Sequence, residues 1–416
     1  MPFKRKQIEL LAPVGSFESL MAAIQGKADA VYFGIGKLNM RSKSTLNFTV
    51  KDLKEIVSIC RKNKIRTYIT LNTVMYDDDL KEMRSVVDAA NKHGIDAVIV
   101  SDQAALMYAR KKKMEIHLST QINISNYESL KFYSGYADVA VLARELTLKQ
   151  IKNIAAKIKK NKLCGPSRKP IRLELFAHGA LCMAVSGKCY LSLHEYDHSA
   201  NRGECFQICR RGYTVTDNET GAELAIDNEY IMSPKDLCTI GFLDKITDAG
   251  VTVLKIEGRA RPAEYVKTVC ECYNEALLAI EKRSYDKKLT DALTAKLSTV
   301  FNRGFWDGYY LGKKLGEWSG VYGSKATKRK TYLGKGTNYF SKIGVAEFQM
   351  ETGTLKTGDE IIITGPTTGV LEMTVGEMHD DNNKPVGKVE KGQRFAIKTE
   401  KQVRRSDKLF RLDKVE

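Results

Sequence analysis

Short apolar runs alternate with longer amphipathic segments along the first part of the chain. The runs are rich in Val, Ile and Leu and predict buried strands at residues 8–14, 30–34, 67–71, 97–101, 116–121, 139–144, 173–179 and 251–258. Helical patterns such as residues 51–64 follow most of these runs. Because alternating strands and helices form parallel sheets, and eight such strands can close a ring, the pattern predicts an α/β fold of the (β/α)8 TIM-like barrel type.

One connection in this pattern is much longer than the others. About seventy residues separate the seventh and eighth predicted strands, whereas βα loops usually have about two to six. Five of the nine cysteines lie in this insertion, at about residues 180–250. In a barrel, the insertion would leave from the carboxyl end of strand seven, which is the face where barrel enzymes carry their active sites. We therefore expect the functional site there.

The last part of the chain has a different pattern. A long helix is expected from Pro262 to about Lys282, and an aromatic, glycine-rich segment with the basic run KATKRK follows it. From Thr331 onward, short alternating runs between turn sequences predict a small antiparallel β barrel. We therefore predict a barrel domain at 1–285, a linking helical and aromatic segment at 286–330, and a β domain at 331–416.

Charge indicates the class of partner. The 67 Lys and Arg residues exceed the 50 Asp and Glu residues by 17, which favours a polyanionic partner, and nucleic acid above an acidic lipid surface. No window reaches the roughly 18 apolar residues that cross a bilayer. The N-terminus turns polar too early for a signal peptide. We expect a cytoplasmic protein with no membrane association, and the sequence gives no indication of its oligomeric state.

The cysteines of the insertion are the clearest chemical signal. Cys182, Cys189, Cys205 and Cys238 are too widely spaced for the C-x-x-C pairs of a zinc ribbon, and Cys209 competes with Cys205 as a ligand. Four thiolates from one insertion would suit an iron-sulfur cluster, because its ligand spacing is set by the fold. From spacing alone, zinc and reduced thiols that only pack remain alternatives.

Several sequence blocks carry a family resemblance over nearly all of residues 9 to about 310. With ELLAPVGSFESLMAAIQGKADAVYFG, VLARELTL, ELFAHGALCMAVSGKCYLS, NRGEC and LKIEGRARPAEYV, the chain resembles the peptidase U32 family, historically called collagenase-like. The resemblance implies RNA or quinone hydroxylation and a 4Fe-4S cluster, here on Cys182, Cys189, Cys205 and Cys238. Some branches use prephenate as the hydroxyl source for 5-hydroxyuridine at the tRNA wobble position or for a ribosomal cytidine. The C-terminal β domain resembles the extension of the tRNA-acting branch.

This resemblance leads to a specific hypothesis for the site. We expect a prephenate-dependent tRNA uridine hydroxylase that binds the anticodon arm and a small dicarboxylate donor. Such a donor requires guanidinium forks and other polar groups at the ends of strands, for which the candidates are Arg41, Gln121, Arg144, Lys255 and Arg259. The candidates for proton transfer are Glu145, Glu257 and His178. Structural ion pairs at the barrel rim are the alternative role for the charged residues.

Other functions are compatible with parts of the sequence. The segment HEYDH at 194–198 matches the H-E-x-x-H pattern of zinc proteases, and Cys182 with His178 could form a nucleophile pair. Gly-x-Ser-x-Gly is absent, and Ser186 has no assigned partner. A U32-type peptidase is thus the first alternative function. A non-catalytic accessory protein for rRNA or quinone hydroxylation is the second, and its basic segments would include 146–171.

Overall fold

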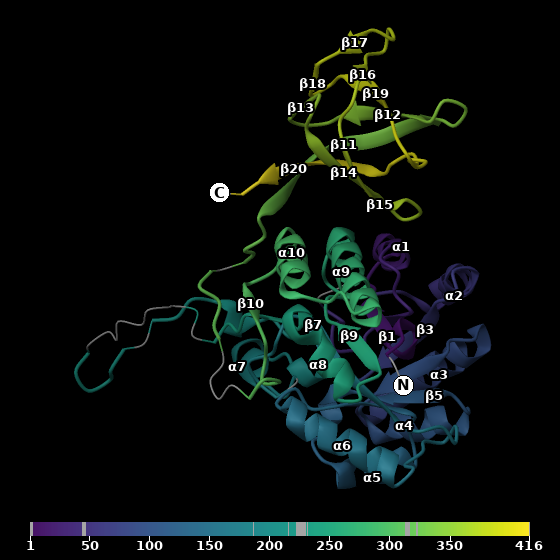
Figure 1. The fold of residues 1–416 in the computed structure, drawn as a ribbon, viewed down its shortest axis with the longest axis vertical. Helices are drawn as coiled ribbons and strands as arrows, with labels where there is room; N and C mark the ends of the chain where they lie inside the picture. The colour runs from purple at the N-terminus through teal and green to yellow at the C-terminus, as the bar shows by residue number, and fades with distance from the viewer. Residues whose placement is uncertain are drawn as a thin grey trace.

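The computed structural model describes residues 3–43, 47–185, 187–214, 216–221, 230, 232–312, 317–321 and 323–415. Eight parallel strands form a closed barrel (Figure 1), and they are β1 (Glu9–Pro13), β2 (Ala30–Gly34), β3 (Arg66–Leu71), β4 (Ala97–Val100), β5 (Glu115–Leu118), β6 (Val139–Val141), β7 (Arg172–Gly179) and β9 (Val253–Ile256). The ring closes because β9 pairs with both β7 and β1. The predicted barrel and its eight strands are confirmed.

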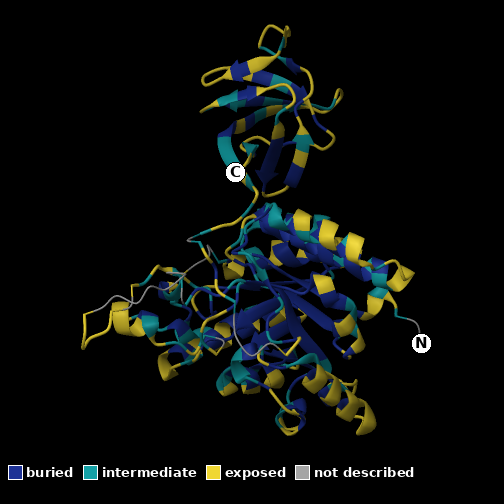
Figure 2. Cartoon of the chain, turned by 60° about the vertical axis from the view of Figure 1, so that its left-hand side comes forward, coloured by how far each residue is buried: buried dark blue, intermediate teal, exposed yellow. Residues whose placement is uncertain are grey.

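An outer layer of helices covers the barrel. These helices are α1 (Phe17–Gln25), α2 (Leu53–Lys62), α3 (Leu80–His93), α4 (Gln103–Lys111), α5 (Tyr127–Ser134), α6 (Leu148–Lys160), α8 (Leu243–Asp248) and α9 (Ala263–Lys282). Each of the longer ones turns an apolar stripe inward, as α2 does with Leu53, Ile56, Val57 and Cys60. Figure 2 shows the result as a buried interior with exposed outer helix faces. None of the helices in the described ranges is long and apolar enough to cross a membrane.

The insertion after β7 has little regular structure. Its described part contains α7 (Leu191–Tyr196), the 3-10 turns η5 (Ala200–Arg202) and η6 (Ile208–Arg210), and β8 (Asp236–Cys238). Strand β8 pairs antiparallel with the end of β7, and β10 (Phe305–Trp306) pairs parallel with β8. The other 3-10 turns are η1 (Arg5–Gln7), η2 (Val50–Asp52), η3 (Asp77–Asp79), η4 (Thr120–Ile122) and η7 (Ile240–Phe242). The predicted insertion after strand seven is confirmed.

The segment that follows α9 packs on the barrel. Helix α10 (Lys287–Ser298) lies against α9, and Leu297, Trp306 and Tyr310 are buried in the same hydrophobic core as the barrel helices. The hydroxyl of Tyr310 donates a hydrogen bond to the carbonyl oxygen of Phe176 in β7 at 2.8 Å. Residues from 286 to about 312 therefore contribute to the barrel's core.

The C-terminal residues form the predicted antiparallel β domain. Its strands are β11 (Lys328–Phe340), β12 (Val345–Met350), β13 (Thr354–Lys356), β14 (Glu360–Gly365), β15 (Gly369–Thr374), β16 (Met378–His379), β17 (Pro385–Val386), β18 (Lys388–Glu390), β19 (Arg394–Lys398) and β20 (Lys408–Lys414). Eight of them form one sheet with β15 and β17 at its edges, and β13 pairs with β18. The domain has its own core around Phe348 and Phe395, whose rings stack at 5.5 Å.

The β domain contacts the barrel along helices α1 and α9 (Figure 1). The side chain of Gln25 on α1 donates to the Thr368 carbonyl oxygen at 3.0 Å and accepts from the Val370 amide at 2.9 Å. Lys330 forms an ion pair of 2.9 Å with Glu264 at the start of α9. The glutamine thus pairs with backbone of the β domain much as a neighbouring strand would.

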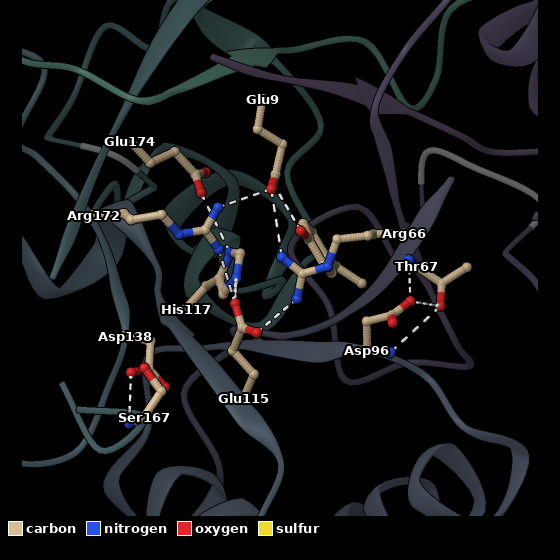
Figure 3. A network of polar contacts seen from close by, with 11 residues as sticks. Glu9, Arg66, Thr67, Asp96, Glu115, His117, Asp138, Ser167, Arg172 and Glu174 are labelled. Carbon is tan, nitrogen blue, oxygen red and sulfur yellow. Dashed lines mark hydrogen bonds and ion pairs between the residues drawn. The ribbon is translucent and has the colours of Figure 1, made fainter. Parts of the chain in front are cut away.

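The floor of the barrel is a closed ring of charges (Figure 3). Glu9, Arg66, Glu115 and Arg172 begin alternate strands, so their side chains form one layer of the interior. Arg66 lies 3.5 Å from Glu9 and 2.6 Å from Glu115, while Arg172 lies 2.8 Å from Glu9 and 2.9 Å from Glu115. Each carboxylate therefore has two cationic partners.

A second polar layer lies two residues further along the same strands. It contains Tyr68, His117 and Glu174, and His117 and Glu174 are fully buried. A small apolar layer of Ala30, Ala97, Val139 and Val253 comes from the other four strands. The interior is therefore packed in the layered manner of such barrels, but with ionic groups where branched aliphatic residues are usual.

We predict that the buried carboxylates make stability depend on acid pH. Burial opposes ionisation of Glu115 and Glu174, yet their cationic neighbours hold the pKa of each at about 2. Unfolded glutamate has a pKa of about 4.3, so the native state binds fewer protons and loses stability as pH falls from there toward 2. Urea unfolding should show a free energy of unfolding that falls steeply below about pH 5, where the two carboxylates titrate in the unfolded state.

Glu115→Gln should flatten this acid slope, because the variant removes one of the two titrating groups. Glu281→Gln is the matched control, since Glu281 is exposed near the end of α9. Wild-type and Glu115→Gln profiles that superimpose would contradict the assignment.

Candidate active site

A pocket opens at the carboxyl ends of the barrel strands, between the barrel and the insertion. Its lining comes from strand residues Tyr32, Thr70, Phe176 and Lys255 and from the loops that follow the strands. Its lining also includes thiols from the insertion, here called the thiol wall, and basic side chains, here called the cationic wall. The pocket therefore lies on the face where the sequence placed the functional site.

The thiols of Cys182, Cys189, Cys205 and Cys209 all line this pocket. Burial raises the pKa of Cys209 to about 11, and the neighbouring Cys182, Cys205 and Cys189 act in the same direction, as expected for thiols that lie close together. Within the described ranges, no three His, Cys, Asp or Glu side chains converge closely enough to hold a metal ion as they stand. The four thiols share one wall without meeting at a point.

A glycine turn places this wall against the barrel. Gly203 has a φ of +85°, and an added Cβ there would lie 2.2 Å from the carbonyl oxygen of Asn39. The hydroxyl of Ser42 donates to the Gly203 carbonyl oxygen at 3.2 Å. Only glycine fits this close approach, which explains the glycine of NRGEC and positions Cys205 two residues later.

Cys238 lies away from the other predicted ligands. It is buried in β8, where it pairs in register with His178 of β7, and it does not line the pocket. The structure therefore brings Cys209, and not Cys238, to Cys182, Cys189 and Cys205. The pairing of the strands is the reason. Cys238 is held in β8 against the end of β7, whereas Cys209 lies in η6, a part of the insertion that lines the pocket.

Two of the predicted binding residues, Arg144 and Arg259, form no ion pair with a carboxylate of the described residues. Arg144 stacks on the ring of Phe176 at 3.8 Å and donates to the Ala180 carbonyl oxygen at 3.1 Å, while its buried Nε has no hydrogen-bond partner. Arg259 donates to Asn39 Oδ1 at 3.0 Å and Thr70 Oγ1 at 2.8 Å. Burial lowers the pKa of both, that of Arg259 to about 10. Buried cations without counter-charges attract an anion.

The remaining predicted binding residues also lie in the pocket. Arg41 donates to Glu257 Oε1 at 3.1 Å and 2.7 Å from its Nε and one terminal nitrogen. Gln121 in η4 accepts from Asn72 at 3.3 Å and from the Ser119 hydroxyl. The Lys255 ammonium lies 2.7 Å from Glu174 and 4.6 Å from the ring centre of Tyr32. All five residues predicted to bind substrate are therefore gathered here.

Only one of the three predicted proton-transfer groups lines the pocket. Burial opposes ionisation of Glu257, but the positive charge of Arg41 and its hydrogen bond bring the net pKa below the usual value. Glu145 is exposed after β6. His178 packs among Tyr265, Tyr273 and Phe305, and burial lowers its pKa to about 3, so its ring is neutral.

The zinc-protease motif does not form its usual arrangement. Helix α7 ends at Tyr196, and Asp197 has a φ of +56°, so His194 and His198 do not share one helical face. His198 Nδ1 instead lies 2.9 Å from Glu204 Oε2. Ser186 lies outside the described residues.

Two pocket arginines were missed at the sequence level. Arg261 stacks on Phe301 at 3.5 Å, and Arg210 donates to the Leu181 carbonyl oxygen at 2.6 Å and the Pro234 carbonyl oxygen at 2.5 Å. Arg210 thereby ties both ends of the insertion together. Arg261 follows Arg259 by two residues in EGRAR, a spacing that could have indicated it, whereas nothing around Arg210 distinguished it from other basic residues of the insertion.

Comparison with known proteins gives a consistent family. The model of Peptidase family U32 matches residues 15–320. A protein named collagenase from Porphyromonas gingivalis (strain W83) is 59% identical over 98% of this chain and 98% of its own. The tRNA hydroxylation protein P1 of Bacillus subtilis (strain 168) is 30% identical over 91% of this chain and 88% of its own. A 23S rRNA 5-hydroxycytidine synthase of Escherichia coli (strain K12) is 33% identical over 76% and 47%, respectively.

Among solved structures, that of the U32 peptidase Mk0906 is similar over 60% of this chain and 93% of its own. Its TM-score is 0.39 and its identity 13%, so it adds nothing to the argument about the site. The family model covers the barrel from α1 onward, the cysteine-bearing insertion and the aromatic segment that packs on them. On this match, the chain belongs to peptidase family U32.

Proposed function

We propose that this protein is an iron-sulfur-dependent RNA-hydroxylating enzyme of the cytoplasm that converts the wobble uridine of tRNA to 5-hydroxyuridine. The observation that carries this proposal is the pocket itself, which is lined by four thiols together with Arg144 and Arg259, two guanidinium groups that form no ion pair with a described carboxylate. The relatives named for tRNA hydroxylation and 23S rRNA 5-hydroxycytidine synthesis support RNA hydroxylation as the reaction class.

The thiol wall fits an iron-sulfur cluster in its chemistry. Cys182, Cys189, Cys205 and Cys209 would hold the cluster, because thiolates are the soft ligands that such clusters require. When bound, the cluster would supply one-electron redox chemistry. The thiols would have to move together to bind the cluster, since no three of them converge on one point in the described structure.

The cationic wall would bind the hydroxyl donor, which we propose is a small dicarboxylate such as prephenate. The buried Nε of Arg144 has no hydrogen-bond partner, and Arg259 donates only to neutral oxygens. Each guanidinium can therefore donate hydrogen bonds to a carboxylate. Lys255 lines the same wall and adds a third positive charge. Glu257, held as a carboxylate by Arg41, would accept a hydrogen bond or a proton from the base.

The pocket can take only a base that has left its stack. Unstacking is cheaper in a loop than in a duplex, which favours an anticodon loop as substrate. The excess of 17 positive charges supplies attraction for phosphates, and Lys149, Lys152 and Lys159 are exposed on α6. RNA affinity should accordingly fall with added salt.

A peptidase remains the second candidate, because the relative at 59% identity is named collagenase. The required test is cleavage of gelatin by protein that carries Glu195→Gln or Cys182→Ser. Loss of cleavage in either variant would support the peptidase. Cleavage that survives both changes would identify a contaminating protease.

We predict that a strain without this protein loses the tRNA nucleosides that derive from 5-hydroxyuridine. Mass spectrometry of digested tRNA measures them directly. A plasmid copy of the wild-type chain should restore the nucleosides, and a Cys182→Ser copy should not. Unchanged nucleosides in the deletion strain would contradict the tRNA assignment.

We predict that protein purified without oxygen is brown and holds about four iron atoms per chain. Cys209→Ser should lose the colour and most of the iron, because it removes a thiol of the wall. Cys238→Ser is the matched control and should keep both, since Cys238 lies in β8 outside the pocket. Iron loss in Cys238→Ser with retention in Cys209→Ser would reverse our choice of ligand, and stoichiometric zinc in colourless protein would exclude the cluster.

We predict that Arg144→Met weakens prephenate binding by about 2 kcal/mol, or about thirtyfold, because a charged hydrogen bond is lost. Arg144→Lys should recover only part of this loss, since a lysine cannot form the bidentate fork. Titration calorimetry measures the affinities, and exposed Arg168→Met serves as the control. Equal affinities for all four proteins would place the donor elsewhere.

A further inference from the structure

A chain of ionisable groups runs through the barrel interior from its floor to the pocket, and Figure 3 shows its part from Glu115 to Glu174. Glu115 of the floor ring lies 3.1 Å from His117 Nε2, and His117 Nδ1 lies 3.5 Å from Glu174 Oε2. Glu174 Oε1 accepts from the Lys255 ammonium at 2.7 Å. Lys255 in turn lines the pocket. The chain thus connects solvent-accessible Glu115 with the proposed substrate site in three contacts.

His117 is the unusual member of this chain. Its side chain is completely buried, and both ring nitrogens face carboxylates. A carboxylate can only accept hydrogen bonds, whereas a neutral imidazole has one donor and one acceptor. A neutral ring would therefore direct a lone pair at one of the two carboxylates. An imidazolium, with two N–H donors, matches both.

The charged groups around His117 are consistent with this state. His117 contacts Tyr68 of β3, Glu115 of β5 and Glu174 of β7. The charged groups next to these are Arg66 and Arg172, which pair with Glu115 and with Glu9, and Lys255, which pairs with Glu174. The three carboxylates and the three Arg and Lys cations cancel. A protonated His117 leaves one net positive charge below the pocket, which is the sign that a dianion requires.

Burial lowers the pKa of His117, but the hydrogen bonds and charges of Glu115 and Glu174 outweigh it, so the net pKa is raised. The contact with Glu174 is long for a hydrogen bond, and both His117 Nδ1 and Glu174 Oε2 lack another partner. The nearest oppositely charged group for each of these two atoms is therefore the other one.

We propose that His117 is a positioning residue: a buried imidazolium that balances Glu174 and, through it, directs the Lys255 ammonium at the dianion in the pocket. Glu174 is shared between the two cations, with one oxygen toward each. A neutral His117 would leave Lys255 as the sole counter-charge of Glu174. The ammonium would then be drawn down into the barrel and away from the pocket. The role toward the dianion rests on the proposed function, whereas the protonation of His117 does not.

The protonation is tested by NMR of protein with 15N-labelled histidine, which reports each ring nitrogen without any assay of activity. His117→Gln identifies the signals of His117, and exposed His194 is the internal reference. We expect both nitrogens of His117 to be protonated at pH 7. A neutral His117 ring at pH 7 would overturn the proposal.

The positioning role is tested by the affinity for prephenate as a function of pH. Wild-type affinity should be constant up to the pKa that NMR finds for His117 and should fall above it. His117→Gln should bind prephenate about tenfold more weakly, a change of about 1.4 kcal/mol, while His194→Gln binds as the wild type does. Circular dichroism verifies that both variants are folded.

The outcomes separate the two proposals. An imidazolium at pH 7 together with unchanged affinity across the pKa of His117 would overturn the positioning role. Failure of wild-type protein to bind prephenate at all would reject the proposed donor, and the NMR result would still decide the state of His117.

Discussion

The pairing of β9 with both β1 and β7 is the contact on which the site depends. It joins residues near position 10 to residues near position 255 and closes the barrel into a ring. Arg259 can reach Asn39 and Thr70 only because β9 lies beside β1 and thus close to β2 and β3. The same closure places Lys255 opposite Glu174 of β7. Residues more than 200 positions apart therefore form one wall of the pocket.

The closed barrel also buries charged side chains, which is unfavourable, and ion pairs between these side chains offset the cost. Ionic groups fill two layers where aliphatic side chains would be less demanding, and each is held between partners of opposite charge. Removal of one member would leave another charged and buried, which is strongly unfavourable. The pocket above is built differently, since Arg144 and Arg259 have neutral partners only. The charged groups inside the barrel are thus paired with one another, whereas Arg144 and Arg259 at its mouth are available to a ligand.

The fold was readable from the sequence because hydrophobic periodicity is a local property. All eight barrel strands were expected within a few residues of where they occur. The place of several pocket residues was also predictable, since Arg41, Arg144 and Arg259 follow strand ends and the ends of parallel strands meet at one face. Cys238 could not be placed in this way. Its position depends on a short strand that pairs antiparallel to β7, and no periodicity in three residues reveals such a pairing. The sequence analysis also missed the chain of ionisable groups formed by Glu115, His117 and Glu174. Inward-facing polar residues in a strand look like interruptions of its apolar pattern.

The two hydrogen bonds between Gln25 and the β domain have a consequence for any ligand that contacts both domains. By bonding to backbone groups of Thr368 and Val370, the glutamine fixes the β domain on the flank formed by α1 and α9. No described residue of that domain lines the pocket. A ligand that contacts both the pocket and the β domain would therefore have to extend beyond the pocket, across the part of the barrel that separates them.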